Sequence, residues 1–257
     1  MDDLALALQL ADAADAVSMA RFQASDLHVE TKPDLTPVSD ADQAVERTLR
    51  ELLDRARADD AIHGEEYGSE DGQRQWIIDP IDGTKNFVRG VPVWATLIAL
   101  REGADITTGV VSAPALGRRW WASIQGSASC SAPGMAQRAG LTVSGVGAIA
   151  DASFSFSDSI GWPPGSLDRL LGSTWRQRGY GDFWSHMMVA EGVLDIAAEP
   201  ELKIHDVAAL VPIIHAAGGK ITSFDGSALL WHDPFAELSA LTTNGLLHNS
   251  VVDLLGA

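Results

Sequence analysis

The segment WIIDPIDGTKNF, residues 76–87, contains two carboxylates, Asp79 and Asp82, whose spacing suits metal chemistry. Carboxylates this close repel each other when bare, and a hard cation bound through oxygen, such as magnesium, removes the repulsion. The following pair, Gly83 and Thr84, suits a turn that aims both carboxylates at one spot. Such a turn leaves backbone amides free at the start of a helix, where they can receive a phosphate. The alternative is a loop in which both aspartates only cap a helix and accept local hydrogen bonds.

Three further acidic features could complete a site for several cations. Glu65 and Glu66 lie in the segment HGEEYG, as the residues of a second ligand loop would. Asp206 begins a mostly apolar helix, so its carboxylate lies at the positive end of the helix dipole. Asp40 and Asp42 lie near the start of an earlier helix, and they share with Asp206 the alternative of being helix caps or first-turn acids. Together these acids favour the oxygen-rich site that in-line phosphoryl transfer to water uses.

The elements that must position these residues are predicted from the spacing of apolar side chains. A recurrence every three to four residues predicts helices, and short apolar or alternating runs predict strands. Helices are expected over residues 4–17, 41–57, 183–192, 205–219 and 246–255. Strands are expected over residues 74–79, 93–100, 106–112, 118–124, 152–157, 174–179, 193–198 and 239–244. This mixture predicts a layered α/β sandwich.

Local signals add detail to this outline. Ser39, followed by Asp42, predicts the start of the second helix. The strands within residues 93–124 are expected to be antiparallel neighbours. The strand before them is expected to end at Asp79, because Pro80 cannot donate to a sheet ladder.

Composition and charge limit the classes of function. A chain of 257 residues, 46% of them hydrophobic, can bury a sizeable core. Its apolar runs fall short of the roughly 20 residues that span a bilayer, and the acidic opening of the chain is unlike a secretory signal. We therefore expect a cytoplasmic protein without a membrane partner. The net charge of −17 argues against a nucleic-acid partner and requires bound cations to hold an anionic substrate.

A segment rich in Gly, Ser and Ala, residues 126–147, predicts a boundary between two halves. Residues 1–140 form a predicted N-terminal α+β half with the main metal-binding motifs. Residues 141–257 form a predicted C-terminal α/β half that completes the metal and substrate site. The single cysteine, Cys130, cannot form an internal disulfide and has no histidine nearby to activate it, so it is predicted to be structural.

Taken in order, the acidic motifs resemble those of the inositol monophosphatase family of magnesium-dependent, lithium-sensitive phosphatases. The core motif Asp-Pro-Ile-Asp-Gly-Thr is intact at residues 79–84, and the elements at 64–66 and 206–219 match in the same order. The resemblance runs from about residue 32 to residue 244 and implies a five-layered αβαβα sandwich with two or three magnesium ions. The ligands it implies are Glu65, Asp79, Asp82, Asp206 and the carbonyl of Ile81, with Asp40 helping to hold a more weakly bound ion.

The resemblance also implies roles in hydrolysis of the phosphate monoester of a small metabolite. Thr84, acting with Glu65 or Asp40, would position and deprotonate the attacking water. The backbone amides of Gly83 and Thr84 would hold phosphate oxygens. Relatives are commonly homodimers, so a homodimer is expected.

Within the family, residues 178–219 are most similar to the branch that dephosphorylates histidinol phosphate, above all in the element Gly181-Asp182-Phe183. The amine and imidazole of that substrate would suit an acidic pocket, for which the candidates are Asp182 and Glu199. The alternatives are that Asp182 caps a helix and that Glu199 is a solvated charge at a strand end. His205 replaces the aromatic residue that relatives usually carry before the metal-binding aspartate.

Other functions stay open from the residues alone. Relatives that act on inositol phosphate, fructose bisphosphate or a 3'-phosphonucleotide share the same metal residues. A noncatalytic anion-binding protein would lack at least one ligand, whereas every acidic ligand position is filled here.

Overall fold

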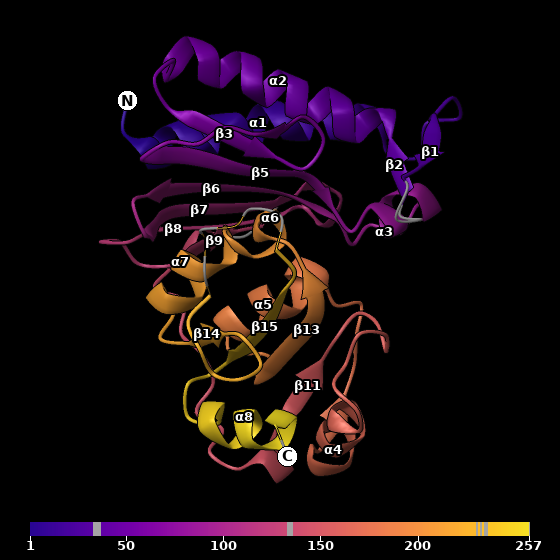
Figure 1. The fold of residues 1–257 in the computed structure, drawn as a ribbon, viewed down its shortest axis with the longest axis vertical. Coiled ribbons are helices and arrows are strands. Elements are labelled where there is room, and N and C mark those ends of the chain that lie inside the picture. The colour runs from indigo at the N-terminus through magenta and orange to yellow at the C-terminus, as the bar shows by residue number, and fades with distance from the viewer. Residues whose placement is uncertain (33–36, 133–135, 230, 232, 234–235, 257) are drawn as a thin grey trace.

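The chain is arranged in five layers in the computed structural model, which describes residues 1–32, 37–132, 136–229, 231, 233 and 236–256 (Figure 1). Helices cover one face of a large sheet, further helices lie between this sheet and a smaller one, and a last pair covers the far face of the smaller sheet. The αβαβα sandwich is therefore confirmed. Residues 33–36, which fall within the range of about 32–244 over which the resemblance runs, lie outside the described residues.

The helical layers are formed by elements from both ends of the chain. The outer pair on the large sheet is α1 (Asp3–Arg21) and α2 (Asp40–Ala56). The middle layer holds α5 (Asp182–Ala190), α6 (Ile204–Val207) and α7 (Leu210–Ala216), and the last layer holds α4 (Ser166–Ser173) and α8 (His248–Gly256). Shorter helices are α3 (Thr84–Arg89), η1 (Pro114–Leu116) and η2 (Ile149–Asp151). No helix among the described residues is long and apolar enough to cross a membrane.

The large sheet has eight strands in the order β10-β9-β8-β7-β6-β5-β3-β4. From β5 to β10 all neighbours are antiparallel, as expected for the strands within residues 93–124, whereas β3 and β5 are parallel. The strands are β3 (Ala61–Gly64), β4 (Gly68–Ser69), β5 (Arg74–Asp82), β6 (Ala95–Glu102), β7 (Asp105–Ala113), β8 (Arg118–Ser123), β9 (Ser129–Ser131) and β10 (Arg138–Ala139).

The smaller sheet has five strands in the order β12-β11-β13-β15-β14. Its strands are β11 (Ser153–Ser155), β12 (Arg176–Gln177), β13 (Ile196–Leu202), β14 (Lys220–Thr222) and β15 (Leu238–Thr243). A separate pair is formed by β1 (Val29–Thr31) and β2 (Pro37–Ser39). The boundary predicted after residue 140 falls between β10 and β11, where the chain passes from one sheet to the other. That these halves are domains stays a prediction.

Three expectations about single elements need correction. The expected strand at 174–179 is only the two-residue β12. Strand β5 does not end at Asp79 but passes through Pro80 to Asp82. The expected helix over 205–219 is divided into α6 and α7, because Pro212 lacks the N–H that would bond to the carbonyl of Ala208.

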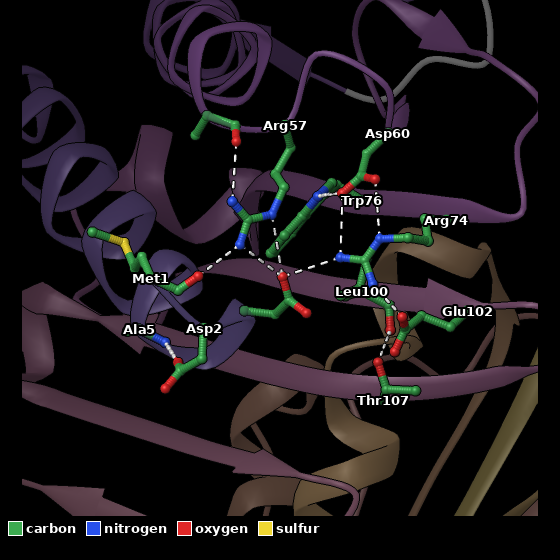
Figure 2. Close-up of polar contacts among 12 residues, drawn as sticks. Met1, Asp2, Ala5, Arg57, Asp60, Arg74, Trp76, Leu100, Glu102 and Thr107 are labelled. Atoms are coloured by element: carbon green, nitrogen blue, oxygen red, sulfur yellow. Dashed lines mark hydrogen bonds and ion pairs between the residues drawn. The ribbon is translucent and has the colours of Figure 1, made fainter.

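The end of β5 opposite the two aspartates is anchored by an ion-pair network (Figure 2). Arg74 donates from Nε to Asp60 Oδ1 at 3.0 Å and from Nη2 to Asp3 Oδ1 at 3.0 Å. Arg57 also donates to Asp3 Oδ1, at 3.1 Å, and Trp76 donates from Nε1 to Asp60 Oδ2 at 3.0 Å. These contacts join α1, the end of α2 and β5, so the strand that carries the acids is fixed at its start.

A buried histidine makes the fold sensitive to acid. His186 of α5 is 1% exposed, and its Nδ1 lies 2.7 Å from Thr242 Oγ1 of β15. Burial lowers the pKa of His186 to about 4. Because the same group titrates near its ordinary value of about 6.5 when unfolded, protons bind the unfolded chain first as the pH falls. The stability that the neutral imidazole contributes is full above pH 6.5 and is lost between that pH and about 4.

A His186→Gln variant is therefore expected to lose part of the acid dependence of the free energy of unfolding. At about 1.4 kcal/mol per pKa unit, the wild type should lose up to about 3 kcal/mol more than the variant between pH 6.5 and pH 4. Urea unfolding at several pH values in this window measures the difference. The exposed His28, changed to Gln, is the control that should leave the slope unchanged. If the free energy of unfolding falls equally steeply with pH in His186→Gln and in the wild type, His186 is not the source of the acid sensitivity.

Candidate active site

A bulge in β5 brings Asp79 and Asp82 to one point. In a regular strand, side chains three residues apart point to opposite faces of the sheet. Asp79 pairs with Leu97 of β6 and Asp82 pairs with Ala95, so β5 has one more residue than β6 between the two pairs. The extra residue returns both carboxylates to the same side, which is a common use of bulges beside active sites.

Three carboxylates converge at this bulge, because Asp206 joins the pair from α6. Oxygen atoms of Asp79, Asp82 and Asp206 all lie within 4.8 Å of one another. Asp206 is oriented by the backbone N–H of Lys203, which donates to its Oδ2 at 2.6 Å. Burial is the largest cause that raises the pKa of all three carboxyls; repulsion from neighbouring acids adds to it at Asp79 and Asp82, and repulsion from Glu65 adds to it at Asp206, where His205 acts in the opposite direction. Such closely spaced, mutually repelling oxygens, buried at Asp79 and half-buried at Asp82 and Asp206, fit a hard divalent cation such as magnesium.

Glu65 lies beside this group, on the turn between β3 and β4. Its charge is among the causes that raise the pKa of Asp79 and of Asp206. Lys32 Nζ donates to Glu65 Oε1 at 2.7 Å and to Glu66 Oε1 at 2.6 Å. The predicted ligand loop is therefore at the site, and in this structure both of its carboxylates accept from the one ammonium group of Lys32.

The turn after Asp82 is shaped by Gly83 and Thr84. Gly83 has a φ of 82°, and a Cβ atom there would lie 3.0 Å from the carbonyl oxygen of Val93, so both conformation and space favour glycine. Thr84 begins α3, and its Oγ1 donates to the carbonyl of Ile81 at 2.9 Å. The backbone amides of Gly83 and Thr84 precede the first hydrogen-bonded turn of α3, as the phosphate-binding prediction requires.

Asp42, and not Asp40, contacts Thr84. Thr84 Oγ1 lies 3.3 Å from Asp42 Oδ1, while Asp42 Oδ2 accepts from the N–H of Ser39 at 2.8 Å in the expected capping box. Asp40 instead accepts from Arg21 Nη2 at 2.7 Å. Residues two apart on a helix point in nearly opposite directions, so only one of these aspartates can face the site. The signal was present in the sequence, since Asp42 is aligned with the apolar positions Val45 and Leu49 of α2.

Asp182 lies next to the turn at Gly83, and its own backbone has a costly conformation. Its φ is 51°, a region that non-glycine residues rarely adopt. Asp182 Oδ2 accepts from Asn86 Nδ2 at 3.3 Å, and it would lie 3.4 Å from a Cβ atom at Gly83. The capping alternative is wrong, because α5 begins at Asp182 itself, with Gly181 at the N-cap and no side-chain cap hydrogen bond, while the N–H of Phe183 donates to Asp82 Oδ2 at 2.9 Å. Burial, followed by repulsion from Asp206, raises the pKa of Asp182 to about 7.

Glu199 of β13 is the second acid predicted for the substrate pocket, and together with Asp182 it forms what is called here the acidic wall. It is 1% exposed, so the alternative of a solvated charge is wrong. The hydroxyl of Ser157 donates to its Oε2, whereas its Oε1 has no hydrogen-bond partner within the described part of the chain. Burial, with repulsion from Asp182, raises the pKa of Glu199 to about 8. A buried acceptor without a donor is a site that a ligand cation can satisfy.

His205 stacks on a second histidine, His63, next to the converging carboxylates. Its Nδ1 lies 3.4 Å from His63 Nε2, and the two ring centroids are 5.6 Å apart. Its Nε2 lies 3.9 Å from Asp206 Oδ1. The imidazole therefore lies beside Asp206, as their neighbouring positions in the sequence suggested.

The layered fold and the converging acids define a class of protein that comparison with known proteins identifies. The model of the inositol monophosphatase family matches residues 2–254, and the chain belongs to this family. A histidinol-phosphatase from Mycobacterium tuberculosis is 53% identical over 262 residues, covering 100% of this chain and 98% of that protein. A histidinol-phosphatase from Streptomyces coelicolor is 52% identical over 264 residues, covering 99% and 97%. A solved IMPase from Thermotoga maritima has a TM-score of 0.85 at 28% identity, covering 100% and 97%.

Thr96 of β6 is expected to hold the bulge in shape. It is fully buried, and its Oγ1 donates to the carbonyl of Pro80 at 2.8 Å. Thr96→Val keeps the side-chain shape but removes this donor, which should cost about 1 to 3 kcal/mol of stability and raise the magnesium concentration needed for half-maximal phosphatase activity. Urea unfolding and a magnesium titration measure both effects. Thr107→Val, which removes a hydroxyl far along the same sheet, should not move the titration. An unchanged titration for Thr96→Val would show that the bulge does not need this hydrogen bond.

Proposed function

We propose that the protein is a magnesium-dependent histidinol-phosphatase that hydrolyses L-histidinol phosphate to L-histidinol and phosphate in histidine biosynthesis. The observation that carries the proposal is the acidic pair of half-buried Asp182 and buried Glu199, both close enough to Asp82 that their charges raise its pKa. An inositol ring carries no positive charge and would not compensate these two acids, whereas the amine of histidinol would. Near-complete coverage by two histidinol-phosphatases supports the same substrate.

The metal-binding residues we propose are the converging acids and their neighbours. Asp79, Asp82, Asp206, Glu65 and the carbonyl of Ile81 would hold two or three magnesium ions. When bound, these ions supply charge neutralisation at the phosphate oxygens and an acidified water as the nucleophile. Asp40 keeps only the outlying role of the sequence prediction, since it is engaged by Arg21.

The chain's own groups orient the reaction. Thr84 Oγ1 lies 2.9 Å from the carbonyl oxygen of Ile81 and 3.3 Å from Asp42 Oδ1, where it would orient the attacking water, accept a proton from that water and pass its own proton to Asp42 Oδ1. In this role Asp42 replaces Asp40, and Glu65, whose charge raises the pKa of Asp42, would assist. The amides of Gly83 and Thr84 hold phosphate oxygens. Asp182 and Glu199 pair with the cationic end of the substrate, which places its phosphate at the bulge.

The proposal is tested by phosphate release from histidinol phosphate, myo-inositol 1-phosphate, fructose 1,6-bisphosphate and 3'-phosphoadenosine 5'-phosphate, each with magnesium and with EDTA. We expect the highest kcat/KM for histidinol phosphate and no release in EDTA. A preference for another member of the panel would retain the metal site and reject the substrate. Release that EDTA does not reduce would reject the metal site. A homodimer, a cytoplasmic location and sensitivity to lithium are further predictions from the family resemblance.

A further inference from the structure

Glu46 is a fully buried acid in α2 that lies outside the set of proposed ligands. Its Oε2 accepts from the backbone N–H of Glu66 at 2.7 Å. Its Oε1 accepts from the backbone N–H of Tyr67 at 3.1 Å and from Nε of Arg50 at 2.8 Å. Because a buried carboxylate is costly unless it is well hydrogen-bonded, this acid has a specific task at these amides.

The amides that Glu46 binds belong to the turn that carries Glu65. A Cβ atom at Gly64 would lie 1.9 Å from Glu46 Oε1, so the carboxylate fills the space that any side chain at Gly64 would need. Arg50, which is paired with Glu46, donates from Nη2 to the carbonyl of Gly68 at 2.7 Å. Helix α2 therefore packs against the turn at Gly64 and holds it by hydrogen bonds at residues 66–68, and Glu65 lies between Gly64 and these hydrogen-bonded residues.

We propose that Glu46, with Arg50 as its partner, is a positioning residue that sets the backbone of this turn so that Glu65 reaches the metal ions. The inference rests on the proposed function. If the amides of Glu66 and Tyr67 lost their acceptor, the turn would relax and Glu65 would follow Lys32, its partner in this structure. Outer groups that orient metal ligands are worth about 10- to 100-fold in metal affinity.

The test is the dissociation constant for Mn²⁺, titrated in the absence of substrate and followed by electron paramagnetic resonance, for the wild type and Glu46→Gln. Glutamine keeps the shape but turns one acceptor into a donor that faces a backbone N–H. We expect Mn²⁺ affinity to fall about 10- to 100-fold, and the magnesium concentration for half-maximal activity to rise with little change in kcat at saturation. Glu51→Gln, an exposed change on the same helix, should leave both values unchanged.

The milder Arg50→Lys variant keeps the charge beside Glu46 and removes the fork that also reaches Gly68. It should show a smaller loss of Mn²⁺ affinity. If Glu46→Gln does not fold, Arg50→Lys alone tests whether this pair positions Glu65. Unchanged Mn²⁺ affinity in a folded Glu46→Gln, or in Arg50→Lys where that variant alone folds, would overturn the proposal and leave Glu46 a purely structural anchor. A wild type that binds no Mn²⁺ would instead reject the proposed function, and the inference with it.

Discussion

An Asp79→Asn variant is expected to lose at least about 10³-fold in kcat at saturating magnesium, while its metal-free form unfolds at a higher temperature than the metal-free wild type. The loss follows because Asp79 is central to the converging carboxylates and its amide cannot carry the charge that a cation requires. The gain follows because Asp79 is 2% exposed and its carboxylate is repelled by Glu65, Asp82, Asp206 and Asp42. The same charge therefore serves activity and destabilises the empty fold.

Calorimetry with EDTA and with magnesium separates these effects. The wild type should melt at a higher temperature with magnesium, since the ion binds only the folded state. Asp79→Asn should melt about 2 to 5 °C above the wild type in EDTA and respond little to magnesium. Asp54→Asn, an exposed change on α2, should behave as the wild type in both buffers. A less stable Asp79→Asn in EDTA would mean that repulsion is not what the metal relieves.

The second large effect is expected on substrate choice. Asp182→Asn should lower kcat/KM for histidinol phosphate by about 10- to 100-fold, because it removes a charge-assisted hydrogen bond worth about 1.5 to 3 kcal/mol. Activity on myo-inositol 1-phosphate, which has no amine, should change much less. Asparagine tolerates the positive φ of this position, so the backbone of the site should be preserved.

Steady-state kinetics with both substrates on the same enzyme preparation gives the ratio of kcat/KM for histidinol phosphate to kcat/KM for myo-inositol 1-phosphate. A fall of equal size for the two substrates would place Asp182 in general support of the metal site instead of substrate recognition. Glu199→Gln tests the second acid of the acidic wall by the same two kcat/KM values. Asp168→Asn, in the exposed first turn of α4, is the matched control.

The fold class and the acidic centre could be predicted, because both depend on residue types and on their spacing along the chain. Apolar periodicity identified the main helices, and the acids at 79, 82 and 206 were recognised from their types and neighbours. The mutual geometry could not be obtained in this way. Side chains three apart in a strand face opposite ways, and only the pairing of β5 with β6 shows the extra residue that reverses this.

The misplaced details have equally physical causes. Asp40 and Asp42 are both acids at a helix start, and their roles separate only when the buried side of α2 is known. A glutamate in a helix is usually solvated, yet Glu46 is covered by the turn after β3, whose backbone N–H at Glu66 donates to it. Long-range contacts of this kind leave no local signal in the spacing of residues.

The bulge in β5 makes the number of residues between the two aspartates part of the catalytic apparatus. Removing one residue between Asp79 and Asp82 would abolish the bulge and leave the two carboxylates on one face of a regular strand but about 6.6 Å apart along it, and adding one would shift the turn at Gly83 away from its partners. Substitutions that respect the count, such as a different apolar side chain at Ile81, disturb only packing. Insertions and deletions should therefore be far more harmful here than point changes, whatever residue is gained or lost.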